Sequence, residues 1–131
     1  MRTYRISEAA RLLAVSDDTV RRWIDHGVLS TTGASPVEIS GDALARRAVE
    51  LAATPVEPGD VLSSARNRFT GLVTRVQVDG IMAQVDIQAG PHRVVSLMSA
   101  EAVADLDLQV GSLATAIVKA TTVIVEAQRS A

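Results

Sequence analysis

The sequence contains no cysteine, which excludes disulfide bonds and thiolate metal sites. Only 2% of its 131 residues are aromatic, so a core must be built from Val, Ile, Leu and Ala. It has no apolar run of the length that a membrane-spanning helix or a signal peptide needs. The formal net charge is −2, whereas a tight non-specific DNA binder usually carries clustered Lys or Arg. We therefore expect a soluble, cytoplasmic protein with no membrane partner.

Proline is scarce, and two of the four prolines fall in one short stretch that divides the chain. Residues 54–61 include Pro55, Pro58 and Gly59, a composition typical of a linker. Apolar residues recur at helical spacing before this stretch and at alternate positions after it. The sequence thus predicts an α+β protein with a helical domain over residues 1–53, a linker over 54–61 and a second domain over 62–128.

The N-terminal half reads as helix, short turn, helix. Ser7 is the expected N-cap of a first helix over residues 6–14, and Ser16 is the expected N-cap of a second. Gly27 is placed to end the second helix as its C′ residue. A third helix is expected over residues 43–52.

The stretch from Ser16 to Leu29, SDDTVRRWIDHGVL, resembles the start of a MerR or excisionase-type winged helix-turn-helix domain. The apolar stripe of Val20, Trp23 and Ile24 would face the core. The resemblance implies that the other face of this helix enters the major groove of DNA, unless its arginines only solvate a packed helix. The candidates for contact with phosphates and base edges are Thr19, Arg21 and Arg22.

The following loop departs from the winged pattern. Winged relatives usually carry basic residues there, but residues 30–39 contain no Lys or Arg. We expect this loop to add little to DNA affinity, so that DNA binding would depend on two such domains acting together.

The C-terminal half predicts a small OB-like β-barrel of five strands and one short helix. Asp79-Gly80 is the expected hairpin turn, and Ser99 the expected N-cap of the helix. The predicted strands cover residues 72–78, 81–87, 93–98, 113–119 and 122–126, and the helix covers 100–106. The expected core positions in the hairpin are Val76, Val78, Ile81, Ala83, Val85 and Ile87.

Two polar motifs lie at the ends of this domain. Ser64-Ala65-Arg66-Asn67 precedes the first strand, and Lys119-Ala120-Thr121-Thr122 lies near the C-terminus. Cations beside hydroxyls are suited to an oxyanion. Together the two motifs resemble those of the Mop or molbindin family, a branch of the TOBE domains, and the resemblance spans about residues 62–127. It implies binding of molybdate or tungstate, with no other metal.

The resemblance also implies the site residues. Ser99 falls on a hydroxyl ligand of the family, whereas Ala102 replaces a serine that relatives often carry. The implied oxyanion-binding residues are Ser64, Ala65, Arg66, Asn67, Ser99, Lys119, Ala120 and Thr121. Plain structural roles stay open to several of them: a turn for Ser64, an ion pair with Asp86 or Glu126 for Arg66, a solvated strand edge for Lys119 and an N-cap for Ser99.

In this family the sites lie between subunits, so the resemblance implies a homo-oligomer, at least a dimer, with Arg66 and Lys119 of one site coming from different subunits. The residues offer no base–nucleophile set, so we do not expect an enzyme. The leading hypothesis is a molybdate-responsive, DNA-binding transcriptional regulator. The alternative is a molybdate storage protein whose N-terminal domain serves assembly.

Overall fold

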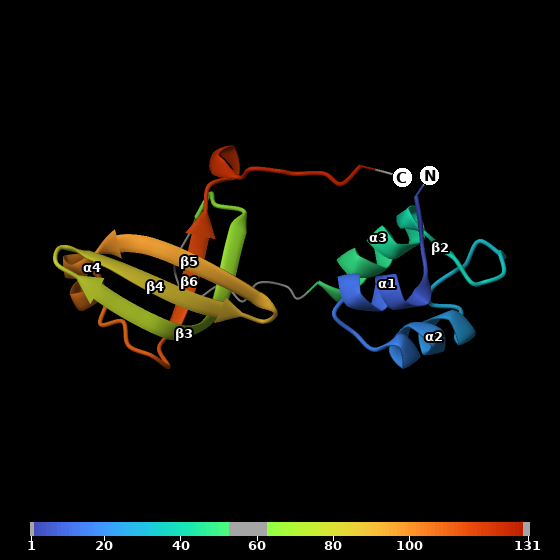
Figure 1. Cartoon of the computed structure of the whole chain (residues 1–131), viewed down its shortest axis with the longest axis horizontal. Helices are drawn as coiled ribbons and strands as arrows, with labels where there is room; N and C mark the ends of the chain where they lie inside the picture. The colour runs from blue at the N-terminus through green and yellow to red at the C-terminus, as the bar shows by residue number, and fades with distance from the viewer. Residues whose placement is uncertain (1, 53–62, 130–131) are drawn as a thin grey trace. The chain divides into compact units, whose positions relative to one another are not determined.

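The computed structural model describes residues 2–52 and 63–129 (Figure 1). Contacts divide the chain into two compact units, Met1–Thr54 with Gln128–Ala131, and Pro55–Ala127. The first unit is mainly helical and the second is built on an antiparallel sheet, which confirms the α+β class. The predicted linker over residues 54–61 lies outside the described residues.

The N-terminal unit packs three helices and a two-stranded sheet around one core. Its elements are β1 (Thr3–Tyr4), α1 (Ile6–Leu12), α2 (Asp17–Asp25), β2 (Ile39–Ser40) and α3 (Gly41–Leu51). The core consists of Ala9, Ala10, Val20, Leu29, Ile39, Ala43 and Leu44. Trp23 and Ile24 pack against it beside Val20, which confirms the predicted stripe on the second helix.

Local hydrogen bonds set where these helices begin. The Ser16 hydroxyl accepts from the Thr19 N–H (3.1 Å), which confirms Ser16 as an N-cap, and Gly27 has the positive φ of a C′ residue. The prediction for Ser7 is wrong, because α1 already begins at Ile6. Arg5 takes the N-cap position instead, because its N–H donates to the carboxylate of Glu8 in the first turn of α1 (3.1 Å).

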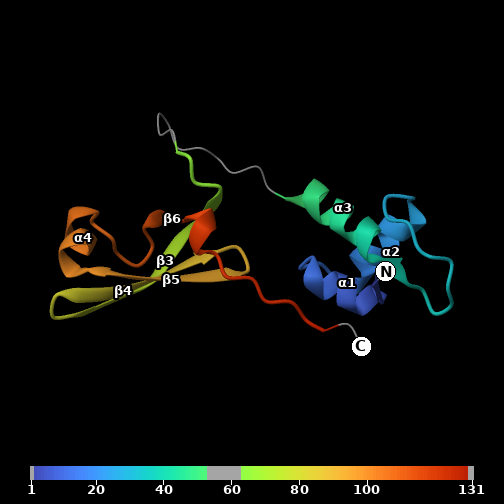
Figure 2. The ribbon, with the colours of Figure 1, turned by 90° about the horizontal axis from the view of Figure 1, so that it is seen from above.

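The C-terminal unit is a curled four-stranded sheet in the order β5-β4-β3-β6, with α4 after β5 (Figure 2). Its elements are β3 (Asn67–Asp79), β4 (Met82–Ala89), β5 (His92–Ser99), α4 (Ala100–Asp105), β6 (Leu113–Val118) and the 3-10 turn η1 (Ala120–Thr122). Ser99 accepts from the Ala102 N–H (3.0 Å), which confirms it as the N-cap of α4. Val73, Ala83, Val85, Ile87 and Val103 form the core of this unit.

The long strand β3 ties the sheet together. Its first half pairs with β6 and its second half with β4, and the register with β4 shifts between Val73 and Arg75. Before this shift Gly71 lies so close to the backbone of Gln88 that a Cβ at residue 71 would overlap the Gln88 carbonyl. The glycine therefore allows β3 to bend from one partner strand to the other.

Three predictions for this unit are wrong. Residues 122–126 do not form a strand, since Thr122 ends η1 and the chain beyond it pairs with nothing among the described residues. Ile81 is exposed because it belongs to the hairpin turn, and Val78 is exposed because it lies beside that turn. The predicted burial of Ala83, Val85 and Ile87 is confirmed.

Candidate oxyanion site

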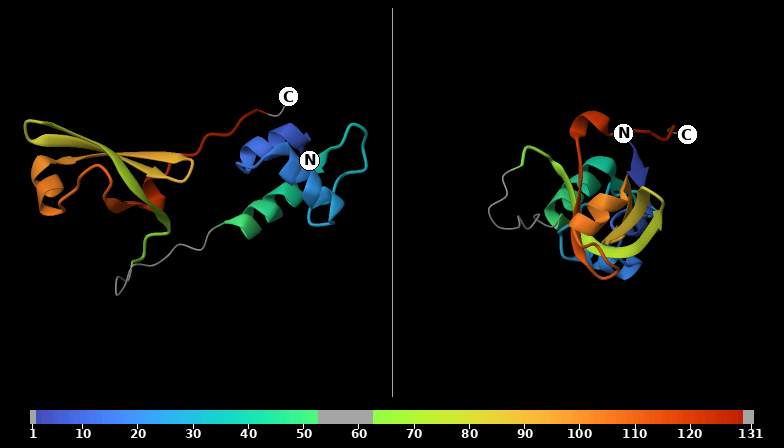
Figure 3. Two further views of the ribbon diagram at one scale, coloured as in Figure 1. Left: turned by 90° about the horizontal axis from the view of Figure 1, so that it is seen from below. Right: turned by 90° about the vertical axis from the view of Figure 1, so that its left-hand side faces the viewer.

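The pairing of β3 with β6 brings the two polar motifs together. Asn67 at the start of β3 is the register partner of Val118 at the end of β6. The Asn67 amide also donates to the Val118 carbonyl (3.1 Å). Arg66 and Lys119 lie one residue outside this pair, so residues more than fifty positions apart in sequence become neighbours. Figure 3 shows the start of β3 beside the end of β6 and η1.

A pocket of about 430 Å³ lies at this junction. Two cations contribute to it, together with three hydroxyl-bearing side chains and no carboxylate. Its lining residues are Ser63, Ser64, Ala65, Arg66, Ile117, Lys119, Ala120 and Thr121. Six of the eight predicted oxyanion-binding residues, all except Asn67 and Ser99, therefore line one cavity, although they come from two separate motifs.

The turn η1 and the preceding Lys119 form one side of the pocket. The Thr122 N–H and hydroxyl both donate to the Lys119 carbonyl (3.0 and 2.9 Å), and Lys119 is exposed. On the side formed by the first motif, the Ser63 hydroxyl accepts from the Ala65 N–H (3.1 Å) and still has its own proton to donate. The pocket therefore offers charged and neutral donors to an anion.

Two predicted residues are not among those that line the pocket. Asn67 uses its amide to join the two strands, so it positions the motifs. Ser99 caps α4 and is the register partner of Met82, at the hairpin end of β4. Arg66 and Lys119 of one chain both line this pocket. That different subunits supply the two cations of one site stays a prediction.

Ser63 and Ile117 line the pocket but are not among the site residues that the resemblance implies. Ser63 directly precedes the first motif, and its hydroxyl was the signal available. Ile117 could not be found from its own type, because only the register that pairs it with Arg68 brings it to the pocket.

Asp86, one of the two acids considered as partners of Arg66, pairs with Arg93 instead. The Asp86 carboxylate accepts two bonds from Arg93 (2.7 and 3.0 Å) and one from the Gln84 amide (3.0 Å). These bonds, first that from Gln84 and then those from Arg93, lower the pKa of Asp86 below its ordinary value. Within the described residues no ion pair joins Arg66 to Asp86 or Glu126.

The predicted DNA-contacting residues all lie on α2. Arg21 and Arg22 are exposed, and Thr19 is half-buried. Arg21 donates to Asp18 (3.2 Å), while Arg22 donates to the Thr19 hydroxyl (3.4 Å). Both arginines thus point away from the core, but each has a contact on its own helix.

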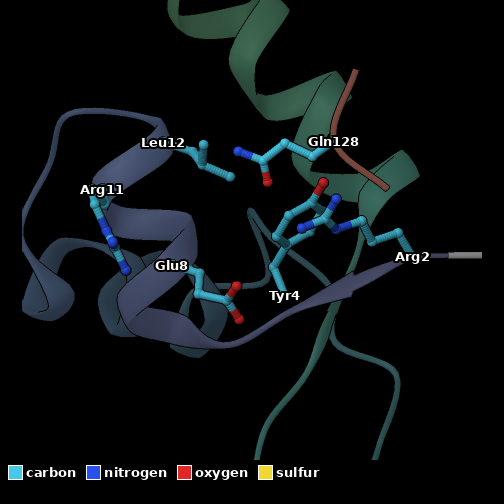
Figure 4. Close-up of a pocket in the computed structure, with 6 residues that line it drawn as sticks. All are labelled: Arg2, Tyr4, Glu8, Arg11, Leu12 and Gln128. Atoms are coloured by element: carbon cyan, nitrogen blue, oxygen red, sulfur yellow. The ribbon is translucent and has the colours of Figure 1, made fainter. Parts of the chain in front are cut away.

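A second hollow, of about 380 Å³, lies in the N-terminal unit (Figure 4). Its lining residues are Arg2, Tyr4, Glu8, Arg11, Leu12 and Gln128. The Arg2 guanidinium stacks on the Tyr4 ring at 5.2 Å, and the Glu8 carboxylate shares the hollow. A carboxylate disfavours an anion, so this hollow is a poorer oxyanion site than the pocket between the two motifs.

Two searches of residues 2–52 and 63–129 found nothing. No three His, Asp or Glu side chains gather there as metal ligands would. None of the helices in these ranges has the length and apolar character required to cross a membrane.

Residues 63–125 match the sequence profile of the TOBE domain. A probable molybdenum-pterin-binding protein of Haemophilus influenzae is 43% identical over 63 residues, which make up 47% of this chain and 91% of that protein. Among solved structures, a molybdate-binding protein from Sporomusa ovata is 31% identical, with a TM-score of 0.49 over 51% of this chain and 100% of its own.

Two further structures are similar. MopII from Clostridium pasteurianum is 33% identical, with a TM-score of 0.48 over 50% of this chain and 100% of its own. The cytoplasmic molybdate-binding protein ModG, solved with molybdate bound, is 34% identical with a TM-score of 0.45; the match covers 47% of this chain and 44% of ModG. The TOBE profile and the near-complete coverage of the Haemophilus relative together show that this chain belongs to the TOBE-domain family.

Proposed function

We propose that this protein binds molybdate or tungstate in the pocket between its two polar motifs, and that it acts as a molybdate-responsive, DNA-binding transcriptional regulator in the cytoplasm. The observation that carries the proposal is the meeting of Arg66 and Lys119 in one cavity with the hydroxyls of Ser64 and Thr121. The names of its relatives supply the choice of molybdate among oxyanions. In this proposal the protein binds its ligand and catalyses no reaction on it.

The chemistry of the pocket suits a tetrahedral dianion. Arg66 and Lys119 can balance a charge of about −2, and hydrogen bonds from charged donors are about twice as strong as neutral ones. Ser63, Ser64 and Thr121 add hydroxyl donors that can rotate toward oxygens in different directions. The absence of a carboxylate from the lining removes the repulsion that an anion would otherwise meet.

Self-association is part of the proposal. A single copy leaves many large apolar residues of the C-terminal unit exposed, including Leu97, Leu113 and Ile124. Exposed apolar surface on this scale favours an interface. A homo-oligomer would also present two α2 helices to one DNA duplex, which offsets the weak charge of each N-terminal unit.

The DNA-reading part is supported by the N-terminal unit. A turn of four residues separates α1 from α2, and the exposed face of α2 carries Arg21 and Arg22. Guanidinium groups on such a face suit contacts with phosphates and with guanine. In the proposed mechanism, bound molybdate changes how two copies assemble and so changes the spacing of their α2 helices on DNA.

A second candidate function is molybdate storage, with the N-terminal unit serving assembly. Two observations favour it: the loop between α2 and β2 contains no Lys or Arg, and Arg21 is already paired with Asp18. A storage protein would bind molybdate as tightly but would show no operator sequence and no steep salt dependence of DNA binding.

Calorimetric titration with molybdate, tungstate and sulfate tests the anion site. We expect Arg66→Ala to weaken molybdate binding by about 2 kcal/mol, roughly 30-fold, because it removes a charged donor. Arg75→Ala is the matched control, since Arg75 is exposed on the same unit and does not line the pocket. Equal losses in the two variants, or none in Arg66→Ala, would contradict the assignment.

Selection from a pool of random duplexes tests the DNA part. We expect the wild type to enrich one sequence, and Arg22→Ala to lose most of that binding. Fluorescence anisotropy on the enriched duplex, with and without molybdate, then separates regulation from storage. An affinity that does not respond to molybdate would refute sensing, and a failure to enrich any sequence would favour storage.

A further inference from the structure

One face of the paired strands β3 and β6 gathers positive charge. The hydroxyls of the register partners Thr70 and Thr115 are hydrogen-bonded to each other (2.9 Å), so these two side chains share a face. Because side chains alternate along a strand, the residues at every second position belong to the same face. Toward the pocket these residues are Arg68 and Arg66 from β3 and its start, and Ile117 and Lys119 from β6 and its end.

Arg68 differs from the other two cations of this face. Arg66 and Lys119 are exposed, whereas Arg68 is half-buried. Its Nη1 atom is buried and has no hydrogen-bond partner within residues 2–52 and 63–129. A guanidinium has donors only, and a buried donor without an acceptor costs stability. The chain therefore holds a charged donor in place without giving it an acceptor.

The face also lacks a counter-charge. None of its residues from position 66 to 70 or from 115 to 119 is acidic. In the part of the chain that the structure describes, no ion pair involves Arg66, Arg68 or Lys119. Like charges that share a face repel one another, so this cluster does not stabilise the fold by itself. An anion would supply both the missing charge and the missing acceptor.

Arg68 lies next to the oxyanion pocket. Its register partner Ile117 lines the pocket, and directly opposite residues of antiparallel strands have Cβ atoms about 5 Å apart. Arg66, two residues before it, lines the pocket as well. Arg68 is not itself among the lining residues, so it stands beside the wall that Ile117 forms. Rotation about its side-chain bonds can bring the guanidinium to the pocket without any movement of β3.

We propose that Arg68 is a third cation of the oxyanion site, and that it makes the site selective for doubly charged over singly charged tetrahedral anions. This inference rests on the oxyanion binding proposed above, but on neither self-association nor DNA. The physical reason is that the Coulomb energy is proportional to the charge of the anion. Each cation added to the site therefore favours a dianion twice as much as a monoanion of the same shape.

Competition between two anions tests the selectivity. Molybdate is doubly charged, and perrhenate is a singly charged tetrahedral oxyanion of similar size. Molybdate binding is measured by calorimetry, and perrhenate binding by its competition with molybdate, so that weak binding is also quantified. Arg68→Met removes the charge and the donors but keeps an apolar stem. Arg75→Met is the matched control, because Arg75 is exposed on the same strand and does not line the pocket.

We expect Arg68→Met to weaken molybdate binding about tenfold and perrhenate binding about threefold, because a halved Coulomb energy is the square root of the fold-change. The preference for molybdate should then fall about threefold. Arg68→Lys should keep the preference, since it keeps the charge, but should lose affinity because an ammonium lacks the planar pair of donors. Arg75→Met should change neither anion's binding.

Stability without anion separates a ligand role from a structural role. If Arg68 is held for an anion, Arg68→Met should be at least as stable as the wild type in anion-free buffer, because an unpaired donor and a repelling charge are gone. Denaturant unfolding followed by circular dichroism measures this. A structural role predicts the opposite, a clear loss of stability in Arg68→Met that Arg75→Met does not share.

Three outcomes would overturn the assignment of Arg68 while Arg66→Ala still weakened molybdate binding. They are equal losses for the two anions, no loss beyond that of Arg75→Met, and a loss of anion-free stability in Arg68→Met alone. A wild-type protein that bound neither anion would instead refute the proposed oxyanion site itself.

Discussion

The two units of this chain differ in how completely they bury their own apolar residues. In the N-terminal unit Ala9, Val20 and Ile39 are 0% exposed and lie in one continuous core. In the C-terminal unit Leu97 and Leu113 are 71% and 75% exposed, on β5 and β6, the two outer strands of the sheet. Among the described residues, the first unit exposes five large apolar residues and the second exposes thirteen, so a single copy leaves more of the second unit's apolar surface uncovered.

This difference fits a division of labour. A unit with a closed core keeps its shape whether or not a ligand or a partner is present, which suits the DNA-reading role proposed for it. The proposed self-association would cover the exposed apolar residues of the C-terminal unit, and Ile117 of the candidate oxyanion pocket also lines a groove between β5 and β6. Predictions that damage one unit at a time test the comparison.

The largest expected effect is that of Gly71→Ala in the C-terminal unit. Its Cβ would overlap the Gln88 carbonyl, so β3 and β4 must separate locally, at a cost of about 4 kcal/mol or more. Circular dichroism should show loss of the sheet, while fluorescence of Trp23, the single tryptophan, should report an intact N-terminal unit. Gly41→Ala is the comparison in the other unit: its Cβ would meet the Arg2 carbonyl at 3.2 Å, a tight contact rather than an overlap, so it should cost less and should change the Trp23 signal instead. Simultaneous loss of both signals in Gly71→Ala would show that the units unfold together.

The next effect is that of Ile39→Ala in the N-terminal unit. Ile39 is fully buried, and truncation to alanine should cost about 2–4 kcal/mol. The Trp23 transition should move to lower temperature, and the dissociation constant of the oligomer should stay the same. Val37→Ala, at a position that is 38% exposed, is the matched control. If Ile39→Ala weakened self-association, the N-terminal unit would not be independent of assembly.

Much of this architecture can be read from residue patterns. Caps at Ser16 and Ser99, the turn at Gly80 and the alternate burial along β4 all follow from local rules, which act within a few residues. The two polar motifs also identified the pocket, because their place at the start of β3 and the end of β6 meant that one strand pairing would bring them together.

The failures have physical reasons of a different kind. The β-branched run Val123-Ile124-Val125 favours a strand, but a run of residue types cannot show whether a strand edge is available for it to pair with. Ser99 was predicted both as an N-cap and as an anion ligand. The N-cap role is confirmed, because its hydroxyl accepts from the Ala102 N–H, whereas the ligand role stays a prediction. Ile117 depended on strand register, which side-chain chemistry alone did not reveal.

A smaller effect is expected from Asn67→Ala. The variant loses the hydrogen bond to the Val118 carbonyl, which holds the two motifs in place without lining the pocket. We expect molybdate affinity to fall by about 1 kcal/mol, roughly fivefold. Gln88→Ala is the control, since Gln88 donates to the Gly90 carbonyl (2.9 Å) in a turn of the same unit. A loss as large as that of Arg66→Ala would indicate that Asn67 contacts the anion directly.

The smallest expected effect is the pH dependence due to Asp86. The Gln84 and Arg93 bonds lower the pKa of this carboxyl in the folded protein, below the ordinary value of 3.8. The folded state then binds its proton less readily than the unfolded state does. Its contribution to stability is therefore present above pH 3.8 and is lost as the pH falls through the lowered pKa.

Asp86→Asn should remove this part of the acid sensitivity. The stability difference between wild type and variant should be constant at neutral pH and should shrink as the medium becomes more acidic than the ordinary carboxyl pKa. The stability difference is measured by denaturant unfolding at a series of pH values from neutral to acidic, with circular dichroism as the signal. Glu101→Gln, on the exposed surface of α4, is the control. If the wild-type and Asp86→Asn profiles stayed parallel down to the most acidic condition, Asp86 would keep the same proton affinity in both states.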